Sequence, residues 1–275
     1  MTQPAEERDA APGPGAQPLL NARLLGPMLV TLNGRRVDTT SSRRTRYLLA
    51  YLLLHRRSAV PRDVLMETFW PDSRPEAARN SLHVALTGVR RVLGRAWPGE
   101  VLVRRHGSYQ LVPELPIWVD VDEFERFCGD GRRADRLGAD ELALAAYAAA
   151  DRLYGGDLLA EDPYADWGSW SRDSLRLDLL DVQRRLAELH AAAGDHAAAV
   201  LVARRALEID PCNEPLHRQL MRSYRETDQL HRALAQFHRC AEALWREHRV
   251  RPSADTLQLH RRLRGPQGVQ ARRTA

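Results

Sequence analysis

The stretch EAARNSLHVALTGVRRVL, residues 76–93, decides how the first part of this chain folds. Its apolar residues recur at helical spacing, which predicts an amphipathic helix. The face expected to be buried carries Ala78, Leu82, Ala85, Leu86, Val89 and Leu93. The opposite arc carries Arg79, Asn80, His83, Thr87, Arg90 and Arg91, with Val84 beside them and no carboxylate after Glu76. Side chains of these types read base edges and contact phosphates in DNA.

A hairpin and two helices are predicted ahead of this helix. Residues 28–32 alternate before Asn33-Gly34, a dipeptide typical of tight hairpin turns. An apolar helical face over residues 47–54 predicts the first helix, whose candidate N-caps are Thr40, Ser41 and Ser42. The second helix is expected to begin at Pro61, and PDSRP at 71–75 breaks the chain before the third.

Three arginines, Arg43, Arg44 and Arg46, stand in the first turn of the first predicted helix. Cations are unfavourable there, because the helix dipole places positive charge at that end. A phosphate between the arginines and the helix N-terminus would remove this conflict, so we expect Arg43 and Arg44 to contact phosphates. The alternative is that these side chains are simply exposed.

A second hairpin is predicted after the long helix. Residues 101–112 contain two short strands around a turn at 105–108, and Arg104 and Arg105 make its tip basic. Three helices followed by such a hairpin are the plan of a winged helix. The third helix is then expected in the major groove, while Arg91, Arg104 and Arg105 clamp the flanking backbone.

The charge distribution supports a nucleic-acid partner for this region. Residues 19–115 hold 16 arginines and seven acidic residues, a net charge of +9, whereas residues 1–18 and 116–275 each carry −2. A basic module beside a near-neutral one is typical of a nucleic-acid reader with a partner domain. All 41 basic residues are arginine, which reflects a GC-rich genome rather than DNA binding. A solvated basic surface is the alternative interpretation.

The remainder of the chain is predicted to be helical. From residue 120 to 263 the pattern is helical throughout, and a 34-residue self-similarity is visible. It pairs Leu186 with Leu220, Ala199 with Ala233, Val200 with Leu234, Ala203 with Phe237, and Ala206 with Cys240. This period is that of tetratricopeptide repeats, in which small residues let paired helices pack closely. The fold class is therefore mainly α with small β-sheets.

No catalytic, metal or cofactor site is predicted. The three cysteines form no CxxC pair, and the ten histidines show no metal-ligand spacing. Gly155-Gly156 is interpreted as a turn between helices rather than a phosphate cradle, and no P-loop motif occurs. Trp167, Trp170 and Trp245 are predicted to be core or interhelical anchors.

Localisation is predicted from absent signals. No apolar run reaches the roughly 18 residues that a membrane span needs, and the first residues lack a secretory signal. We therefore expect a cytoplasmic protein with no membrane partner.

The order of these motifs resembles the SARP family of actinobacterial regulators. Residues 25–111 resemble its OmpR-type winged helix through LGP at 25–27, NG at 33–34, FWP at 69–71, LHVALTGVRRVL at 82–93 and the wing motif Gly107-x-Tyr109-x-Leu111. The resemblance implies that residues 82–93 lie in the recognition helix. It adds Tyr109 to the DNA-binding residues. It also implies that the loop of Trp70, Pro71, Asp72, Ser73 and Arg74 faces the transcription machinery.

The second part resembles the bacterial transcriptional activator domain that follows this winged helix in the family. The matching pieces are LYGGDLL at 153–159, Trp170-x-Arg172 and the repeats. The predicted organisation is a disordered tail over 1–18, a winged helix over 19–115, a tetratricopeptide-like activator domain over 116–265 and a disordered tail over 266–275. The chain looks like the short, stand-alone form of the family.

The resemblance implies a transcriptional activator of a secondary-metabolite, antibiotic-like gene cluster. It implies binding to direct repeats in promoter DNA, as a dimer on DNA, and recruitment of RNA polymerase holoenzyme with its sigma factor. Two alternatives stay open: a helical-repeat interaction scaffold that does not bind DNA, and a repressor that uses the same reader.

Overall fold

The computed structural model describes residues 20–38, 42–94, 99–163 and 165–265. The predicted tails and the N-cap candidates Thr40 and Ser41 lie outside these residues. The contacts divide the chain into two compact units. The first unit comprises Met1–Phe124 and Leu153–Asp173, and the second comprises Glu125–Arg152 and Ser174–Ala275. The predicted class, mainly α with small β-sheets in the N-terminal part, is confirmed.

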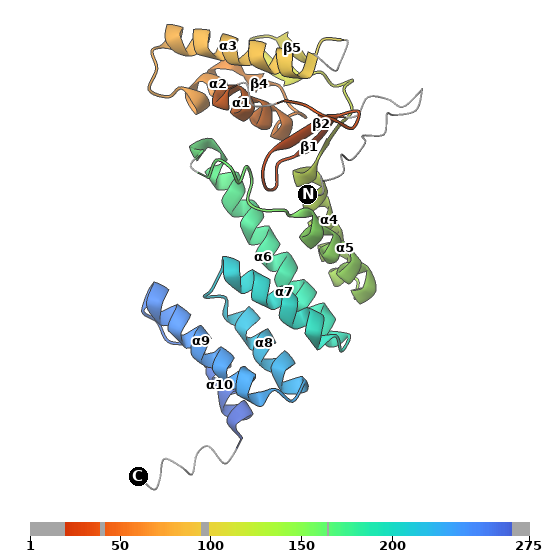
Figure 1. The fold of residues 1–275 in the computed structure, drawn as a ribbon, viewed down its shortest axis with the longest axis vertical. Helices are drawn as coiled ribbons and strands as arrows, with labels where there is room; N and C mark the ends of the chain where they lie inside the picture. The colour runs from red at the N-terminus through yellow and green to blue at the C-terminus, as the bar shows by residue number, and fades with distance from the viewer. Residues whose placement is uncertain (1–19, 39–41, 95–98, 164, 266–275) are drawn as a thin grey trace, which may run out of the picture. The chain divides into compact units, whose positions relative to one another are not determined.

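Two small sheets frame the first unit (Figure 1). The first has the order β3-β2-β1-β7, built from Leu20–Arg23 (β1), Leu29–Leu32 (β2), Arg35–Arg36 (β3) and Ile117–Val119 (β7). β2 runs antiparallel to both β1 and β3, and β7 runs parallel to β1 with Leu20 opposite Ile117. The predicted hairpin is confirmed, because Asn33 and Gly34 adopt φ values of 52° and 78° in the tight turn between β2 and β3. The second sheet has the order β4-β6-β5, built from Val60–Pro61 (β4), Leu102–Arg105 (β5) and Ser108–Leu111 (β6).

Three helices pack between the strands of the first unit, as the sequence predicts. They are Arg43–Leu54 (α1), Arg62–Phe69 (α2) and Pro75–Gly94 (α3). Ser42 is the N-cap of α1, since its side chain accepts a hydrogen bond from the Thr45 amide at 3.0 Å. α3 buries Ala78, Leu82, Ala85, Leu86, Val89, Val92 and Leu93, a set that contains the whole predicted apolar face.

Gly88 lies where α3 approaches α1. A Cβ atom added to Gly88 would stand 2.5 Å from Oγ1 and 2.8 Å from Cγ2 of Thr45. The Thr45 side chain is buried, short and branched, so it has little room to move away. We expect Gly88→Ala to lower the free energy of unfolding by about 1–2 kcal/mol, because overpacking costs about 1–3 kcal/mol and exceeds the helix-propensity gain of up to about 1 kcal/mol. Urea unfolding measures the change.

Gly94→Ala is the matched control for this prediction. Gly94 belongs to the same helix, and nothing lies within 4 Å of the Cβ position. Its substitution is expected to leave stability within about 0.5 kcal/mol of the parent. Equal effects at both positions would contradict the proposed close approach of α1 and α3.

Residues 153–173 belong to the first unit although they lie far along the chain. Their backbone pairs with residues 24–26: Leu159 N donates to Leu24 O at 2.8 Å, Gly26 N to Asp157 O at 3.1 Å and Ala160 N to Gly26 O at 3.0 Å. A Cβ on Gly155 would lie 3.0 Å from Leu25 O. The Gly155-Gly156 pair therefore permits this segment to approach the backbone of residues 24–26 closely. The sequence alone indicated only a turn at these two glycines.

The predicted domain boundary lies between residues 115 and 116, and the two compact units of the structure do not divide there. Residues 116–124 join the first unit because β7 extends its sheet and the Asp120 carboxylate accepts hydrogen bonds from the Leu24 and Leu25 amides. The division instead falls inside Asp120–Arg136 (α4) and Ser169–Ala192 (α6).

The second unit is built from helices. Besides its parts of α4 and α6, it contains His196–Ile209 (α7), Glu214–Glu226 (α8), Leu230–His248 (α9), Ala254–Arg264 (α10) and all but the last residue of Asp140–Leu153 (α5). Four of the five paired repeat positions are buried in both copies, including Ala199 with Ala233 and Ala206 with Cys240. Val200 and Leu234 are half-buried. The 34-residue period therefore corresponds to repeated helix pairs.

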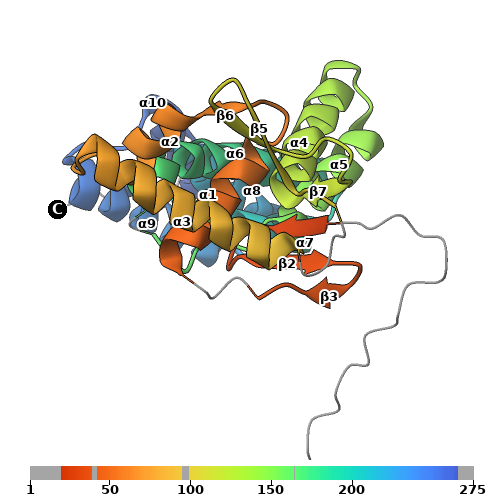
Figure 2. The same cartoon turned by 90° about the horizontal axis from the view of Figure 1, so that it is seen from above.

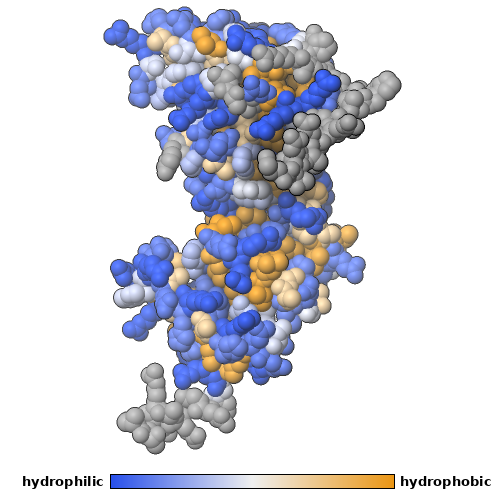
Figure 3. All heavy atoms as spheres, in the orientation of Figure 1, coloured by the Kyte–Doolittle hydropathy of each residue, from blue (hydrophilic) through white to orange (hydrophobic). Residues whose placement is uncertain are grey.

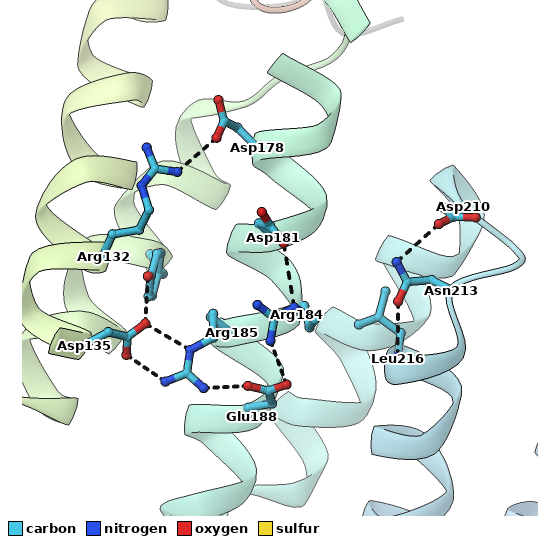
Figure 4. Close-up of polar contacts among 11 residues, drawn as sticks. Arg132, Asp135, Asp178, Asp181, Arg184, Arg185, Glu188, Asp210, Asn213 and Leu216 are labelled. Atoms are coloured by element: carbon cyan, nitrogen blue, oxygen red, sulfur yellow. Dashed lines mark hydrogen bonds and ion pairs between the residues drawn. The ribbon is translucent and has the colours of Figure 1, made fainter. Parts of the chain in front are cut away.

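Ion pairs and caps hold the helices of the second unit in place (Figure 4). Arg185 binds Asp135 through Nη2 at 2.7 Å and also bonds Glu188, and Arg132 bonds Asp178 at 3.0 Å. The hydrogen bond from Arg185 holds the pKa of Asp135 below its ordinary value. Asn213 caps α8 by accepting from the Leu216 amide.

Of the three tryptophans predicted to be core or interhelical anchors, one is packed among other aromatic rings and two are exposed. Trp167 packs in the first unit against Tyr47, Tyr51 and Phe69, with ring centroids 6.1, 5.6 and 5.8 Å away. The prediction of core positions is wrong for Trp170 and Trp245, which are 80% and 55% exposed. The expectation followed from the size of the indole ring, whereas Trp170 stands in the first turn of α6 and Trp245 on an exposed side of α9. In the described part of the chain, no helix combines the length and apolar character that crossing a membrane requires.

Candidate nucleic-acid interface

The outer face of α3 presents polar and basic side chains. Arg79, Asn80, His83, Thr87 and Arg91 are exposed, and Arg90 is half-buried. Val84 is 70% exposed, an unusual position for a branched apolar side chain. The helix therefore separates a buried apolar face from an outer face able to donate hydrogen bonds.

Two local details define what this face can offer. The Thr87 hydroxyl donates to the His83 carbonyl at 2.9 Å, so its hydrogen is bound within the helix and its oxygen remains able to accept a further hydrogen bond. Among the described residues, no carboxylate forms an ion pair with Arg79, Arg90 or Arg91. Their guanidinium groups are thus available to an external anion.

The hairpin of β5 and β6 carries a second basic group. His106 and Gly107 form its turn with φ values of 49° and 80°, and the Arg62 amide anchors the turn by donating to Gly107 O at 3.0 Å. Arg104 and Arg105 are exposed. Figure 1 places α3 and β5 at the same end of the first unit, and Figure 2 views that end from above. The visible surface at this end is largely hydrophilic (Figure 3).

Tyr109 differs from the other residues predicted to contact DNA. It is only 9% exposed, and the Arg104 guanidinium carbon lies 6.0 Å from the centre of its ring. This separation falls within the range of a cation–π interaction. The ring is therefore placed to support the Arg104 side chain.

A carboxylate that the sequence analysis missed stands beside the N-terminus of α1. Asp162 forms an ion pair with Arg46 and lies 3.7 Å from Nε of Arg43. Burial, together with a hydrogen bond to Asp162, raises the pKa of Tyr47 to about 12. Asp162 is 116 residues from Arg46, so no local pattern could have indicated the pair. The first turn of α1 thus already has one anion from its own chain.

Arg43 and Arg44 nevertheless keep their outer surfaces open. The Arg43 side chain is 71% exposed despite the nearby Asp162. Arg44 is exposed, and its guanidinium carbon lies 5.8 Å from the centre of the Trp70 ring.

The loop after α2 projects into solvent. Pro71, Asp72, Ser73 and Arg74 are exposed, whereas Trp70 is half-buried. Trp70 is anchored at its backbone, since its amide donates to Met66 O at 2.8 Å, and its ring lies 6.0 Å from that of Phe69. The Ser73 amide closes the turn by donating to Trp70 O at 3.1 Å.

In the described ranges, no group of three His, Cys, Asp or Glu side chains could hold a metal ion.

Comparison with known families agrees with this arrangement. Residues 119–264 match the family model of the bacterial transcriptional activator domain. Residues 35–111 match that of the transcriptional regulatory protein C-terminal domain, which is of the OmpR type. The first match alone spans more than half of the chain.

Several known regulators are similar over most of their length. The regulatory protein DnrI of Streptomyces peucetius is 29% identical over 258 residues, which cover 91% of this chain and 94% of DnrI. The transcriptional regulatory protein MoaR1 of Mycobacterium tuberculosis is 27% identical, over 87% of this chain and 78% of MoaR1. These relatives are transcriptional regulators and not enzymes, in agreement with the sequence analysis.

A solved structure shares the fold. Mycobacterium tuberculosis EmbR, solved in complex with a low-affinity phosphopeptide, superposes with a TM-score of 0.77 at 26% identity. The match covers 90% of this chain and 65% of the EmbR chain, so this chain spans about two thirds of that relative. By sequence and structure, the chain belongs to the SARP family of transcriptional regulators, in which an OmpR-type DNA-binding winged helix precedes a bacterial transcriptional activator domain.

Proposed function

We propose that this protein is a sequence-specific activator that binds promoter DNA with α3 in the major groove. The observation that carries the proposal is the outer face of α3, which has no carboxylate after Glu76 and lies at the same end of the unit as the basic hairpin. A helix face that only contacts solvent has no reason to exclude acidic residues over this length.

Within this proposal, the residues of α3 divide into two roles. Arg79, Asn80, His83, Thr87 and Arg90 line the groove, where amide and guanidinium groups form paired hydrogen bonds with adenine and guanine. Val84 and the Thr87 methyl lie one helical turn apart and together suit contact with a thymine methyl. Arg91 contacts the phosphate backbone beside the groove.

Backbone contacts also come from outside α3. Arg104 and Arg105 of the hairpin bind phosphates. The Tyr109 ring holds the Arg104 guanidinium in place through a cation–π contact. Arg43 and Arg44 bind phosphates at the N-terminus of α1. Because Asp162 already neutralises part of this charge, Arg43 is expected to contribute less to DNA affinity than Arg104.

The proposal extends to the transcription machinery and the genes controlled. The exposed loop of Trp70, Pro71, Asp72, Ser73 and Arg74 contacts RNA polymerase holoenzyme, including its sigma factor. Two copies bind direct repeats in the promoter as a dimer on DNA, and the protein acts in the cytoplasm. Similarity to DnrI and the family assignment support control of a secondary-metabolite, antibiotic-like gene cluster.

Single substitutions separate base reading from backbone binding. Asn80→Ala is expected to cost about 1–3 kcal/mol on the best site and to relax base choice at one position. His83→Ala is expected to do the same at another position. Arg104→Ala is expected to weaken binding to all sequences similarly and to reduce the salt dependence by about one phosphate contact.

The measurement is binding of each variant to a library of operator sequences across salt concentrations. Arg57→Ala serves as a control of equal charge change, because Arg57 forms an ion pair with Asp122 at 2.7 Å and is not among the residues assigned to DNA. If Asn80→Ala, His83→Ala and Arg104→Ala changed all sequences by the same factor, the assignment of α3 to the groove would be wrong.

The experiment that tests the function itself is footprinting on promoters near the gene, followed by transcription with purified holoenzyme. Protected direct repeats and increased transcription are the expected results. Reduced transcription from a protected site would identify a repressor. Salt-sensitive binding without sequence preference would leave only a solvated basic surface, and no binding would favour the helical-repeat scaffold.

A further inference from the structure

We propose that the second unit contains a binding site for a small organic anion, in a cavity between α7, α8 and α9. The cavity has a volume of about 340 Å³. Ligand sites in proteins commonly enclose roughly 300–1,000 Å³ and combine apolar walls with a few fixed polar groups. This site is separate from the residues assigned to DNA, and the inference does not depend on DNA binding.

Three arginines line the cavity. Arg204 comes from α7, and Arg239 and Arg246 come from α9. No described carboxylate forms an ion pair with any of them, although elsewhere in the second unit Arg132, Arg185 and Arg205 are all paired. Arginines that line one cavity and have no carboxylate partner are suited to a carboxylate, sulfonate or phosphate, which a guanidinium group can bind in bidentate geometry.

Two acidic residues limit the kind of ligand. Glu208 and Glu242 also line the cavity, so its charged side chains sum to +1 rather than +3. This balance favours a ligand with a single anionic group over a polyphosphate. It also offers carboxylate acceptors for hydroxyl or amino groups elsewhere on the ligand.

Part of the cavity lining is apolar. Leu207, Leu220 and Ala243 line it together with Pro211. Pro211 lies in a short loop whose shape is set by polar contacts. Cys212 N donates to Asp210 Oδ1 at 3.0 Å. Asn213 Nδ2 donates to Asp210 Oδ2 at 3.2 Å, a bond drawn in Figure 4. The wall is therefore formed before a ligand binds.

A buried polar pair also lines the cavity. His217 and Gln236 are 3% and 4% exposed, and both line the cavity. His217 Nε2 donates to Pro211 O at 2.9 Å, which leaves Nδ1 to accept from Gln236 Nε2 at 2.6 Å. Burial lowers the pKa of His217 and favours this neutral form. The pair fixes the Gln236 amide, a group able to orient a ligand once its apolar part is enclosed.

The test uses 1-anilinonaphthalene-8-sulfonate as the probe, because it joins an apolar body to one anionic group. Its fluorescence is titrated with the full-length protein. N-phenyl-1-naphthylamine, which has the same rings without the sulfonate, is the matched neutral probe. Saturable binding of one sulfonate probe per chain is the expected result, and its absence would overturn the proposal.

Variants locate the site. Arg239→Gln and, separately, Arg204→Gln are expected to weaken sulfonate binding by about tenfold, which corresponds to about 1.4 kcal/mol. Binding of the neutral probe is expected to change less than twofold. Arg222→Gln is the control of equal charge change, since Arg222 is exposed on α8 and does not line the cavity.

Unfolding curves establish that each variant is folded, which is expected because all three arginines are exposed. The proposal is overturned if Arg239→Gln and Arg204→Gln bind the sulfonate probe as tightly as Arg222→Gln. It is also overturned if they lose the sulfonate and neutral probes equally, because the arginines would then not be recognising the anion.

Discussion

Trp167→Ala is expected to lower the free energy of unfolding by about 3 kcal/mol, the low end of the range for removing a large aromatic side chain from a packed site. The indole packs against Tyr47 and Tyr51 of α1 and Phe69 of α2, with centroids 5.6–6.1 Å apart. These contacts join residues 153–173 to the helices that support α3. The variant is therefore also expected to lose DNA binding at temperatures where the parent protein still binds.

Trp170→Ala is the matched control, because Trp170 lies three positions later and is 80% exposed. We expect its effect to stay within about 0.5 kcal/mol. Trp167→Phe is expected to cost less than Trp167→Ala, since the buried indole N–H of Trp167 has no hydrogen-bond partner among the described residues. Thermal and urea unfolding measure all three. Equal effects at the two tryptophans would refute the role given to Trp167.

Asp120→Ala is expected to destabilise the first unit by about 3 kcal/mol, because each buried donor left without an acceptor costs about 1–3 kcal/mol. Asp120 is 1% exposed, and its carboxylate accepts from the Leu24 amide at 2.8 Å and the Leu25 amide at 2.9 Å. Burial raises the pKa of Asp120, although these hydrogen bonds act in the opposite direction. The carboxylate therefore ties the end of β1 to the start of α4.

The control for this prediction is Asp173→Ala, which removes an exposed carboxylate from the same unit. Its expected effect is within about 0.5 kcal/mol. Hydrogen exchange at the Leu24 and Leu25 amides provides a second measurement, and both amides are expected to lose protection in Asp120→Ala. Unchanged stability together with unchanged exchange would contradict the bonding pattern.

Local sequence patterns correctly predicted most of the helices and turns that carry the candidate interface. The apolar spacing of residues 76–93 defined both the buried and the outer face of α3, because a regular helix places every side chain by position alone. Asn33-Gly34 similarly indicated a tight turn, since its positive φ values favour those residues. The 34-residue period indicated the helix pairs of the second unit.

Other features could not be read from such patterns. β7 contributes a three-residue strand, too short to show an alternation, and its parallel partner β1 begins 97 positions earlier. Trp167 and Trp170 look equivalent in sequence, yet one is packed and the other is exposed. Asp162 looked like an ordinary surface acid until the fold brought it beside Arg46.

The sequence by itself determined the helices, the hairpin turns, the repeats and the polarity of the outer face of α3, because these depend on neighbours within a few positions. Only the tertiary structure decided that residues 116–124 and 153–173 complete the first unit. It also decided that Asp162 neutralises part of the charge at the α1 N-terminus, and that one cavity is lined by three arginines that form no ion pair with a described carboxylate. Contacts across about a hundred residues, such as Leu24 with Asp120, arise from the packing of whole elements and leave no periodic signal.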